Sequence, residues 1–533
     1  MPARVATAAE SVACERATIA AGTTSRVLME RAGRAAADEI IRRFKLILPG
    51  GTTVFTGPGN NGGDGWVVAR CIAEAGFPVT VIEAAPVKTE EAQAAEHDAG
   101  VPTENIEGRP GVESESPHIA DAPVIVDALL GTGSSGQPRD TIAAAIEIIN
   151  RAGRDGAATV ALDVPSGLDA STGEHELCVE ADLTLTFGVL KRGLLLARDV
   201  SGEIVVLDIG LDSGPRVASL PLLVDHDWVA KRIPEIPADA HKGTRRRLAI
   251  VAGGEGMAGA AILAGKGALR SGIGLIRLAV APENIAAIHV GLPEALVQRW
   301  PADATALAKL NDDADALAIG PGLGRSSEVR DLVERVLLAW RGPAVVDADA
   351  LSVFEGDADS LAKLLRGRPA IITPHPAELA RLLGRETADV LKNRFDIGTD
   401  LARDIGGAVL LKGTPTVIFG PDGQRFVSAA GTAALATGGS GDVLSGIVGT
   451  LLAQGIAPSS TLENGATEQA GSNLGSPAEI AAVAAFIHGR AAELCGPVRG
   501  TTLEDILLAL PDAWNEAVAP NEGQTLACLP GVP

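Results

Sequence analysis

The 533-residue sequence contains no tyrosine, and aromatic residues make up only 3% of it. Its cores must therefore be built from aliphatic side chains, which is typical of parallel sheets covered by alanine-rich helices. Hydrophobic residues make up 46% of the chain and charged residues 21%, a balance that indicates packed domains and argues against disorder. The chain is too long for one ordinary domain, so we expect two or three.

Cysteine and histidine are too few and too scattered for disulfide or structural metal chemistry. The five cysteines are odd in number and show no CxxC spacing. This pattern predicts reduced thiols in a cytoplasmic protein. The eight histidines never pair at the spacing of metal ligands, so we expect no zinc site.

Positive charge and long apolar runs are also lacking. The formal net charge is −22, which disfavours nucleic acids and anionic membranes as partners, because both bind basic surfaces. No uninterrupted apolar run approaches the roughly 20 residues of a membrane helix, and Met1–Ala20 shows no signal pattern. We expect a soluble cytoplasmic protein that acts on small molecules as a homo-oligomer.

Short apolar runs alternate with longer amphipathic stretches, which is the rhythm of βαβ units and predicts an α/β fold. In the first half we predict strands at Thr52–Thr56, Val79–Glu83, Val124–Asp127, Thr159–Asp163, Leu183–Phe187 and Ile204–Leu207. In the second half we predict them at Arg247–Ala252, Leu275–Ala279, Ala316–Ile319, Ala344–Val346, Ala370–Thr373, Ala408–Lys412 and Thr416–Phe419.

A proline-containing stretch with little periodicity, Gly210–Lys242, separates the two rhythms. We place a boundary near Leu220, which predicts one domain over residues 1–220 and another over residues 221–533. The segment Pro458–Pro477 is rich in small polar residues and interrupts a helical pattern, so we interpret it as a surface insertion. We expect the last residues, Pro520–Pro533, to form a loose tail.

A glycine-rich motif with an aspartate at or near its end occurs in each half. Gly59–Gly65 reads GNNGGDG and Gly438–Asp442 reads GGSGD. We expect each to be a turn whose aspartate opens a helix. Backbone N–H groups at a helix N-terminus bind anions, and glycine lets a ligand approach closely. The two motifs predict a two-site nucleotide enzyme in which each aspartate is a possible base or cation ligand.

Four polar segments of the first half closely follow predicted strands. They are Asn60–Gly65, Asp127–Gly133, Asp163–Gly167 and Lys191. One such group is more often a cap or a turn residue, but four at strand ends predict a ligand site at the carboxyl edge of a sheet. Asp163 and Lys191 are a candidate acid–base pair. Asn61, Asp127 and Ser166 offer oxygen ligands for a hydrated cation.

Together with Leu28–Gly33, these segments resemble the NAD(P)H-hydrate epimerase family over roughly residues 1–215. The resemblance implies a Rossmann-like three-layer domain that interconverts the R and S epimers of hydrated NAD(P)H at C6 of the nicotinamide ring. It implies that Asn61, Asp127 and Ser166 hold K⁺. It also implies a substrate site formed by Asp163 with Asn60, Asn61, Gly62, Gly63, Asp64, Gly131, Thr132, Gly133, Ser134, Ser135, Gly136 and Gln137.

The second half carries groups that suit phosphoryl transfer. Lys412–Thr416 lies between two predicted strands and can hold a nucleotide phosphate. The amides of Gly438–Gly441 can stabilise charge on the transferred group, while Asp442 accepts the proton of the attacking hydroxyl. His375 lies between prolines at a strand end and is predicted to contact a ligand. A capping role for Asp442 and a structural role for His375 stay open.

With Gly253–Ala261, Gly320–Gly324, the strand-end segment Asp347–Leu351 and His488, these segments resemble the ADP/ATP-dependent NAD(P)H-hydrate dehydratase family over about residues 225–510. The resemblance implies a ribokinase-like α/β domain that phosphorylates the hydrate from ADP, with Mg²⁺, and then eliminates phosphate. It implies that Ala260, Gly322, His375 and Asp442 contact the hydrate, with Asp442 as the base. It implies that Lys412, Gly413, Thr414, Pro415, Thr416 and Gly441 contact the nucleotide.

The leading hypothesis is a bifunctional repair enzyme whose first domain feeds the S epimer to the second. A ribokinase-fold kinase for a vitamin-like alcohol is the alternative for the second half, because the GGSGD motif alone fits both. A binding adaptor without catalysis is the alternative for the first half. A GxGxxG match at Gly254–Gly259 lacks the acidic residue that a dinucleotide site needs, so we interpret it as a turn before a helix.

Overall fold

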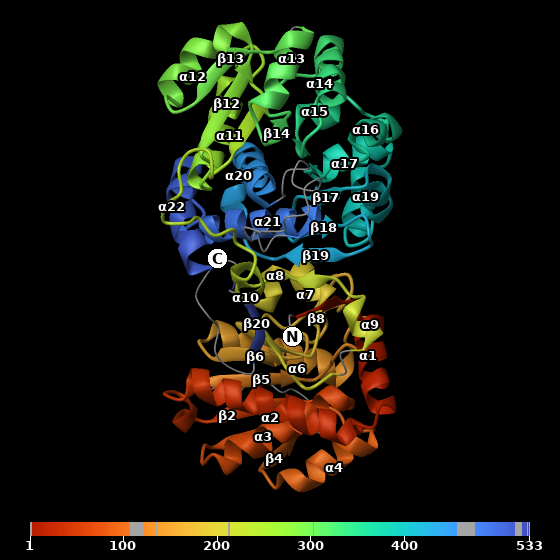
Figure 1. Ribbon diagram of the computed structural model, residues 1–533. Coiled ribbons are helices and arrows are strands. Elements are labelled where there is room, and N and C mark those ends of the chain that lie inside the picture. The colour runs from red at the N-terminus through yellow and green to blue at the C-terminus, as the bar shows by residue number, and fades with distance from the viewer. Residues whose placement is uncertain are drawn as a thin grey trace. The chain divides into compact units, whose positions relative to one another are not determined.

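The computed structural model describes residues 3–106, 122–134, 136–211, 214–301, 303–455, 475–517, 525–529 and 531 (Figure 1). Contacts divide the chain into two compact units. The first unit contains the residues up to Leu222 and the C-terminal strand, and the second contains Leu223–Asn521. Both units have the α/β architecture predicted from the sequence. Residues 458–474 of the predicted insertion lie outside the described residues.

The described part of the first unit forms an eight-stranded sheet that is parallel except at one edge. In spatial order its strands are β20 (Thr525–Leu529), β9 (Glu203–Leu207), β7 (Leu183–Phe187), β6 (Ala158–Leu162), β5 (Val124–Ala128), β2 (Thr52–Thr56), β3 (Val79–Glu83) and β4 (Thr103–Asn105). The helices are α1 (Ala8–Ala20), α2 (Ser25–Phe44), α3 (Asn60–Glu74), α4 (Glu90–Ala99), α6 (Asp140–Arg154), α7 (Arg192–Leu196), α8 (Arg198–Ser201) and α9 (Pro215–Ala218).

Helices cover both faces of this sheet, which makes the unit three-layered. Val54 of β2 belongs to the apolar core that includes Ile40 of α2 and Trp66 of α3. The next residue, Phe55, belongs to a second core that includes Ile146 of α6. Neighbouring strand residues point to opposite faces. Because β2 is apolar on both faces, it suits an interior position of the sheet, between β5 and β3.

A small parallel pair outside the main sheet positions the N-terminal helix. β1 (Val5–Ala6) pairs with β8 (Leu190–Lys191), with Ala6 opposite Lys191. Helix α1 begins two residues later, after Thr7, whose side chain forms a capping box with Glu10. The pairing therefore anchors the start of α1 close to Lys191.

The first glycine-rich motif differs from the prediction. Helix α3 begins at Asn60, so Gly62, Gly63 and Gly65 lie inside the helix and Asp64 does not open it. Packing explains the glycines: a Cβ at Gly62 would lie 2.0 Å from the carbonyl oxygen of Gly57. A Cβ at Gly65 would lie 2.5 Å from that of Ala128 on β5. The glycines let the start of α3 sit directly against the sheet and the loop after β2.

The predicted tail is also wrong, because Thr525–Leu529 forms β20 and pairs antiparallel with β9. Ala527 and Leu529 are buried there. We expect a chain that ends at residue 524 to lose this edge and about 2 kcal/mol of the first unit's unfolding free energy. For a unit of this size the melting temperature should fall by about 4–8 °C. Calorimetry of the truncated chain measures the shift, and an unchanged first-unit transition would contradict this role for β20.

The described part of the second unit forms a ten-stranded sheet. In spatial order its strands are β10 (Leu222–Leu223), β19 (Arg425–Ser428), β18 (Thr416–Phe419), β17 (Ala408–Leu411), β16 (Ala370–Ile372), β15 (Ala344–Val346), β14 (Ala316–Ile319), β11 (Arg247–Val251), β12 (Leu275–Val280) and β13 (Leu296–Arg299). Strands β11 to β17 pair in parallel, whereas β17, β18 and β19 are antiparallel to their neighbours.

Two helices lie along one face of the second sheet: α20 packs on β11, β14 and β15, and α21 packs on β16 to β19 (Figure 1). Ser440 begins α20 and Asp442 lies in its first turn, as predicted. The helices of this unit are α10 (His226–Ala230), α11 (Ala258–Arg270), α12 (Ile285–Gly291), α13 (Ala304–Asp312), α14 (Ser327–Ala339), α15 (Asp349–Ser352), α16 (Ala358–Leu365), α17 (Pro376–Leu383), α18 (Thr387–Lys392), α19 (Thr399–Ile405), α20 (Ser440–Gly455), α21 (Pro477–Leu494) and α22 (Leu503–Glu516).

Candidate functional sites

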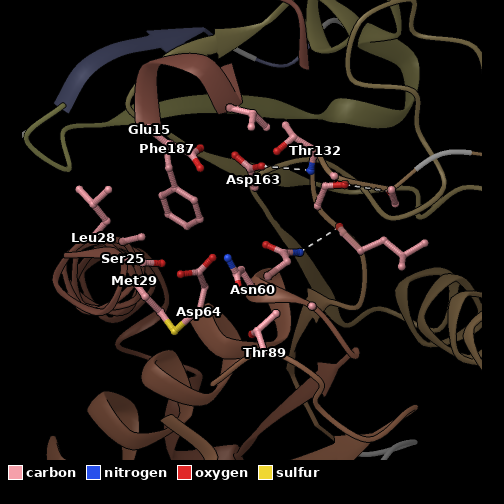
Figure 2. Close-up of a pocket in the computed structure, with 18 of the residues that line it drawn as sticks. Glu15, Ser25, Leu28, Met29, Asn60, Asp64, Thr89, Thr132, Asp163 and Phe187 are labelled. Carbon is pink, nitrogen blue, oxygen red and sulfur yellow. Dashed lines mark hydrogen bonds between the residues drawn. The ribbon is translucent and has the colours of Figure 1, made fainter. Parts of the chain in front are cut away.

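A cavity of about 560 Å³ lies at the carboxyl edge of the first sheet (Figure 2). Residues that follow β2, β5, β6 and β9 line it, together with Phe187 at the end of β7 and residues of α1 and α2. Open parallel sheets present ligand sites at this edge. Figure 2 shows Asn60, Asp64, Asp163 and the ring of Phe187 pointing into the cavity.

Lys191 is fully buried and forms an ion pair with Asp163 at the cavity wall. Its ammonium donates to Asp163 Oδ1, to Thr186 Oγ1 at 3.1 Å and to the carbonyl of Phe187 at 3.0 Å. All three protons of the ammonium therefore have acceptors. Asp163 has a φ of 65°, a left-handed conformation that is uncommon outside glycine. Backbone strain of this kind clusters at functional sites. The ion pair of Asp163 and Lys191 therefore places a proton donor and a proton acceptor together at the cavity wall.

Asn61, Asp127 and Ser166 meet around the backbone of Leu130. Ser166 donates its hydroxyl to Asp127 Oδ1 at 2.6 Å and its N–H to Oδ2 at 2.8 Å. Asn61 Nδ2 donates to the Leu130 carbonyl at 2.9 Å, whereas Asn61 Oδ1 is buried without a partner among the described residues. Burial raises the pKa of Asp127 to about 6, although hydrogen bonds from Ser166 lower it. A bound cation would satisfy the free amide oxygen and stabilise the Asp127 carboxylate, so this donor set fits a cation.

A second cavity, of about 370 Å³, lies in the second unit. The loop Lys412–Thr416 forms one part of its wall, and Ser440 and Gly441 at the start of α20 form another. His488 of α21 also lines it; its Nε2 lies 3.4 Å from Ser440 Oγ. Burial lowers the pKa of His488 to about 4, and the charge of Lys412 adds to the effect, so this imidazole is neutral at physiological pH.

Charged groups gather at the start of α20. Lys412 Nζ lies 2.9 Å from Asp347 Oδ1 and 3.8 Å from Glu378 Oε2. Asp347 is buried and also accepts the hydroxyl of Ser445. Burial raises the pKa of Asp442 to about 7; the charge of Asp347 adds to the rise, and Lys412 opposes it. A carboxyl group that titrates near neutral pH suits a general base.

His375 combines a structural contact with an exposed ring edge. Its Nδ1 accepts the N–H groups of Ala377 and Glu378 at 3.1 and 3.2 Å and so caps α17. The Nε2 atom is left for other contacts and lies 3.5 Å from Glu378 Oε1. The residue lines the second cavity. The structural role left open for His375 by the sequence is therefore present, in the form of a helix cap, and it leaves the ring able to contact a ligand.

Known proteins match both units. A family model described as NAD(P)H-hydrate dehydratase matches residues 248–509, and one described as YjeF-related protein N-terminus matches residues 25–193. The chain is 35% identical over 498 residues to the bifunctional NAD(P)H-hydrate repair enzyme of Moorella thermoacetica, covering 89% of each chain. It is 37% identical over 422 residues to that of Escherichia coli, covering 76% of each. The chain belongs to the family of bifunctional NAD(P)H-hydrate repair enzymes.

Membership of the repair-enzyme family confirms both resemblances predicted from the sequence. The second unit also aligns with the crystal structure of the ADP/ATP-dependent NAD(P)H-hydrate dehydratase from Bacillus subtilis, co-crystallized with ATP and Mg²⁺. That alignment has 30% identity and a TM-score of 0.45, and it covers 55% of this chain and 97% of the other. None of the helices in the described ranges has the length and apolar character needed to cross a membrane.

The two cavities bring together many of the site residues predicted from the sequence, but not all. Those on the first cavity wall are Asn60, Asn61, Asp64, Gly131, Thr132, Gly133, Ser134 and Asp163. Gly62 and Gly63 are buried in helix packing, Gly136 and Gln137 are exposed away from the cavity, and Ser135 lies outside the described residues. Those on the second cavity wall are His375, Lys412, Gly413, Thr414, Pro415, Thr416 and Gly441.

Ala260 and Gly322 form a neighbouring contact instead of lining the second cavity. A Cβ at Gly322, where φ is 57°, would lie 2.8 Å from that of Ala260. Ala260 lies on α11, which packs closely on α20: a Cβ at Gly446 would lie 2.0 Å from the carbonyl oxygen of Ala264. This contact places the start of α11 beside the helix that carries Asp442.

Sequence reasoning missed several groups at these sites. Glu15 and Arg16 of α1 line the first cavity, although no motif marks them. Asp347 lies in the strand-end segment Asp347–Leu351, which the sequence does single out, but without a role for Asp347 itself. Ser428, at the end of β19, lines the second cavity with a buried hydroxyl that has no partner among the described residues. The strand β19 itself was not predicted, so no pattern in the sequence pointed to Ser428.

Proposed function

We propose that the first unit epimerises the R and S hydrates of NADH and NADPH. The second unit then dehydrates the S form with ADP and yields NAD(P)H, AMP and phosphate. The observation that supports this most is that each unit presents a carboxylate–lysine pair at its own cavity: Asp163 with Lys191, and Asp347 with Lys412 beside Asp442. We assign residues 1–220 and the C-terminal strand β20 to the epimerase, and the rest of residues 221–533 to the dehydratase. We also propose that the protein is cytoplasmic, which the cysteine pattern supports, and that it forms a homo-oligomer.

In the dehydratase, Asp442 takes the proton of the hydrate hydroxyl as that oxygen attacks a phosphoryl group of ADP. Lys412 and the amides at the start of α20 stabilise the negative charge on the transferred group. Mg²⁺ bound with the nucleotide would neutralise phosphate charge. Loss of phosphate from C6, together with a proton from C5, then restores the C5–C6 double bond of the nicotinamide ring. Asp347 and Ser445 keep Lys412 in place.

In the epimerase, the pair of Asp163 and Lys191 exchanges the proton of the hydrate hydroxyl. Asn61, Asp127 and Ser166 would hold K⁺ beside the loop Gly131–Ser134, and its charge would favour an anionic oxygen on the substrate. Phe187 offers an aromatic face to the nicotinamide ring.

A coupled assay tests both activities on the full chain. Hydrated NADH of mixed epimers is incubated with ADP, Mg²⁺ and K⁺, while nicotinamide absorbance and phosphate release are followed. We expect a fast phase for the S fraction and a slower phase that recovers the R fraction. A stable phosphorylated product without NADH recovery would support a kinase instead, and recovery limited to the S fraction would rule out the epimerase.

We expect kcat/KM for dehydration to depend on the protonation of Asp442. Because burial raises the pKa of Asp442 to about 7, the base is protonated and inactive below this pH. The rate should therefore rise with pH through about 7 and level off above it. Initial rates on purified S hydrate between pH 5.5 and 9 measure the profile, and a rate independent of pH through this range would contradict Asp442 as the base.

The proposed K⁺ site predicts a cation dependence that is confined to the epimerase. We expect Asp127→Asn, which removes the charge and keeps the shape, to raise the K⁺ concentration for half-maximal epimerisation by about 10–100-fold. The dehydration rate of the same variant on S hydrate should stay at the wild-type value. Epimerisation that is equally fast in tetramethylammonium and in K⁺ would contradict this site.

A further inference from the structure

Helix α1 contributes an acid to the first cavity from outside the matched residues 25–193. Glu15 lines this cavity, and Figure 2 shows its carboxyl group pointing inward together with those of Asp64 and Asp163. The three side chains come from α1, from α3 and from the end of β6. The cavity therefore presents three carboxyl groups, of which Asp163 is paired with Lys191.

Charged groups of both signs surround Glu15. Facing it are Lys191 from β8, Asp163 after β6 and Asp64 from α3, with Arg16 next to it on its own helix. The Lys191 ammonium is saturated by Asp163, Thr186 and the Phe187 carbonyl. Burial raises the pKa of Glu15, and Asp163 adds to the rise while Lys191 opposes it. Burial also raises the pKa of Asp64 well above its ordinary value, with Asp163 and Glu15 adding to it.

Epimerisation of a ring carbon that bears both a hydroxyl and the ring nitrogen needs one base and one acid. When the ring opens, the hydroxyl proton leaves, the carbon–oxygen double bond forms and the C6–N1 bond breaks. The electron pair stays on N1, which must take a proton. Rotation about the C5–C6 bond then offers the other face of the carbonyl, and ring closure returns both protons, so no oxidant or reductant is needed.

We propose that Glu15 is the general acid of the epimerase site, protonating N1 while Asp163 takes the hydroxyl proton. The inference rests on the proposed epimerase function. Asp64 fits the acid role less well, because it lies one turn after Asn61 on α3, and a cation at Asn61 favours an ionised carboxylate nearby. Helix α1 supplies none of the proposed cation ligands. The pairing of β1 with β8 anchors this helix, so Glu15 lies on a different wall of the cavity from Asn61.

Full-chain variants Glu15→Gln, Glu15→Asp and Asp64→Asn test the assignment, with Glu10→Gln as the matched control on the same helix. Purified R hydrate is the substrate, and the chain's own dehydratase reports the S hydrate formed. We expect Glu15→Gln to lower kcat for epimerisation about 100-fold or more, with KM within about twofold. Glu15→Asp should keep an intermediate rate, and Glu10→Gln should stay near the wild type.

The pH profile separates a proton donor from a structural residue. An acid must be protonated, so wild-type epimerisation should fall as pH rises through the Glu15 pKa. Glu15→Gln should remove this alkaline limb, and Asp64→Asn should keep it. A wild-type rate and profile in Glu15→Gln would overturn the proposal, as would an effect on KM alone or loss of the limb in Asp64→Asn. If Glu15→Gln does not fold, Glu15→Asp decides: a rate and profile equal to the wild type would overturn it. Failure of the wild type to consume R hydrate would instead overturn the epimerase function.

Discussion

Replacing Asp442 by asparagine should abolish dehydration of S hydrate and leave epimerisation unchanged. We expect kcat to fall about a thousandfold, which is typical for loss of a general base. Asparagine has the shape of the carboxylate but cannot accept the hydroxyl proton. Its neutral amide also removes the repulsion from Asp347 that helps to raise the pKa of Asp442, so folding should not suffer. Phosphate release and NADH recovery from purified S hydrate measure the effect.

An exposed aspartate of the same unit provides the control. Asp422 lies in a turn and accepts the N–H of Gln424 at 3.1 Å, so Asp422→Asn should keep the wild-type rate. Epimerisation from the S to the R hydrate, followed without ADP, should be equal in both variants. If Asp442→Asn retains more than about a tenth of the dehydration rate, the proton must leave by another group.

Strong local patterns explain which strands could be predicted. β2, β3 and β7 have the predicted bounds, because each is a run of apolar and β-branched residues with turn residues nearby. β13 reads LVQR and β19 reads RFVS, and such short, partly polar strands carry too weak a pattern to be recognised. The sequence predicts a loose tail where β20 lies, because this strand forms only by pairing with β9, more than 300 residues away in the sequence.

The same distinction applies to the candidate sites. Asp163 and Lys412 could be placed at the cavities because polar residues at strand ends converge in a parallel sheet, and Gly441 because it lies in a glycine-rich motif at a helix start. Glu15 was not found, since the short pairing of β1 with β8 brings α1 to the cavity and no local pattern encodes that contact. The glycines of α3 were assigned to a ligand, whereas Gly62 and Gly63 make room for Gly57 and Met29. Composition alone does not separate these two uses of glycine.

Breaking the ion pair of Asp163 and Lys191 should destabilise the first unit as well as stop epimerisation. Lys191 is fully buried, and Asp163 is its one acidic partner among the described residues. Asp163→Asn leaves the ammonium without a counter-charge, and Lys191→Met leaves the carboxylate without one. Removing one partner of a buried pair costs about 3–5 kcal/mol of unfolding free energy. Either change should also lower the epimerisation rate at least about 100-fold.

The double variant distinguishes the catalytic use of the pair from its structural use. With both charges gone, the first unit should recover most of its unfolding free energy, because an uncharged pair of similar volume needs no counter-charge. Epimerisation should stay abolished. The fluorescence of buried Trp66 and calorimetry can follow unfolding of this unit. Losses that simply add in the double variant would show that the two groups are not coupled. Recovery of stability together with activity would show that the proton passes through another residue.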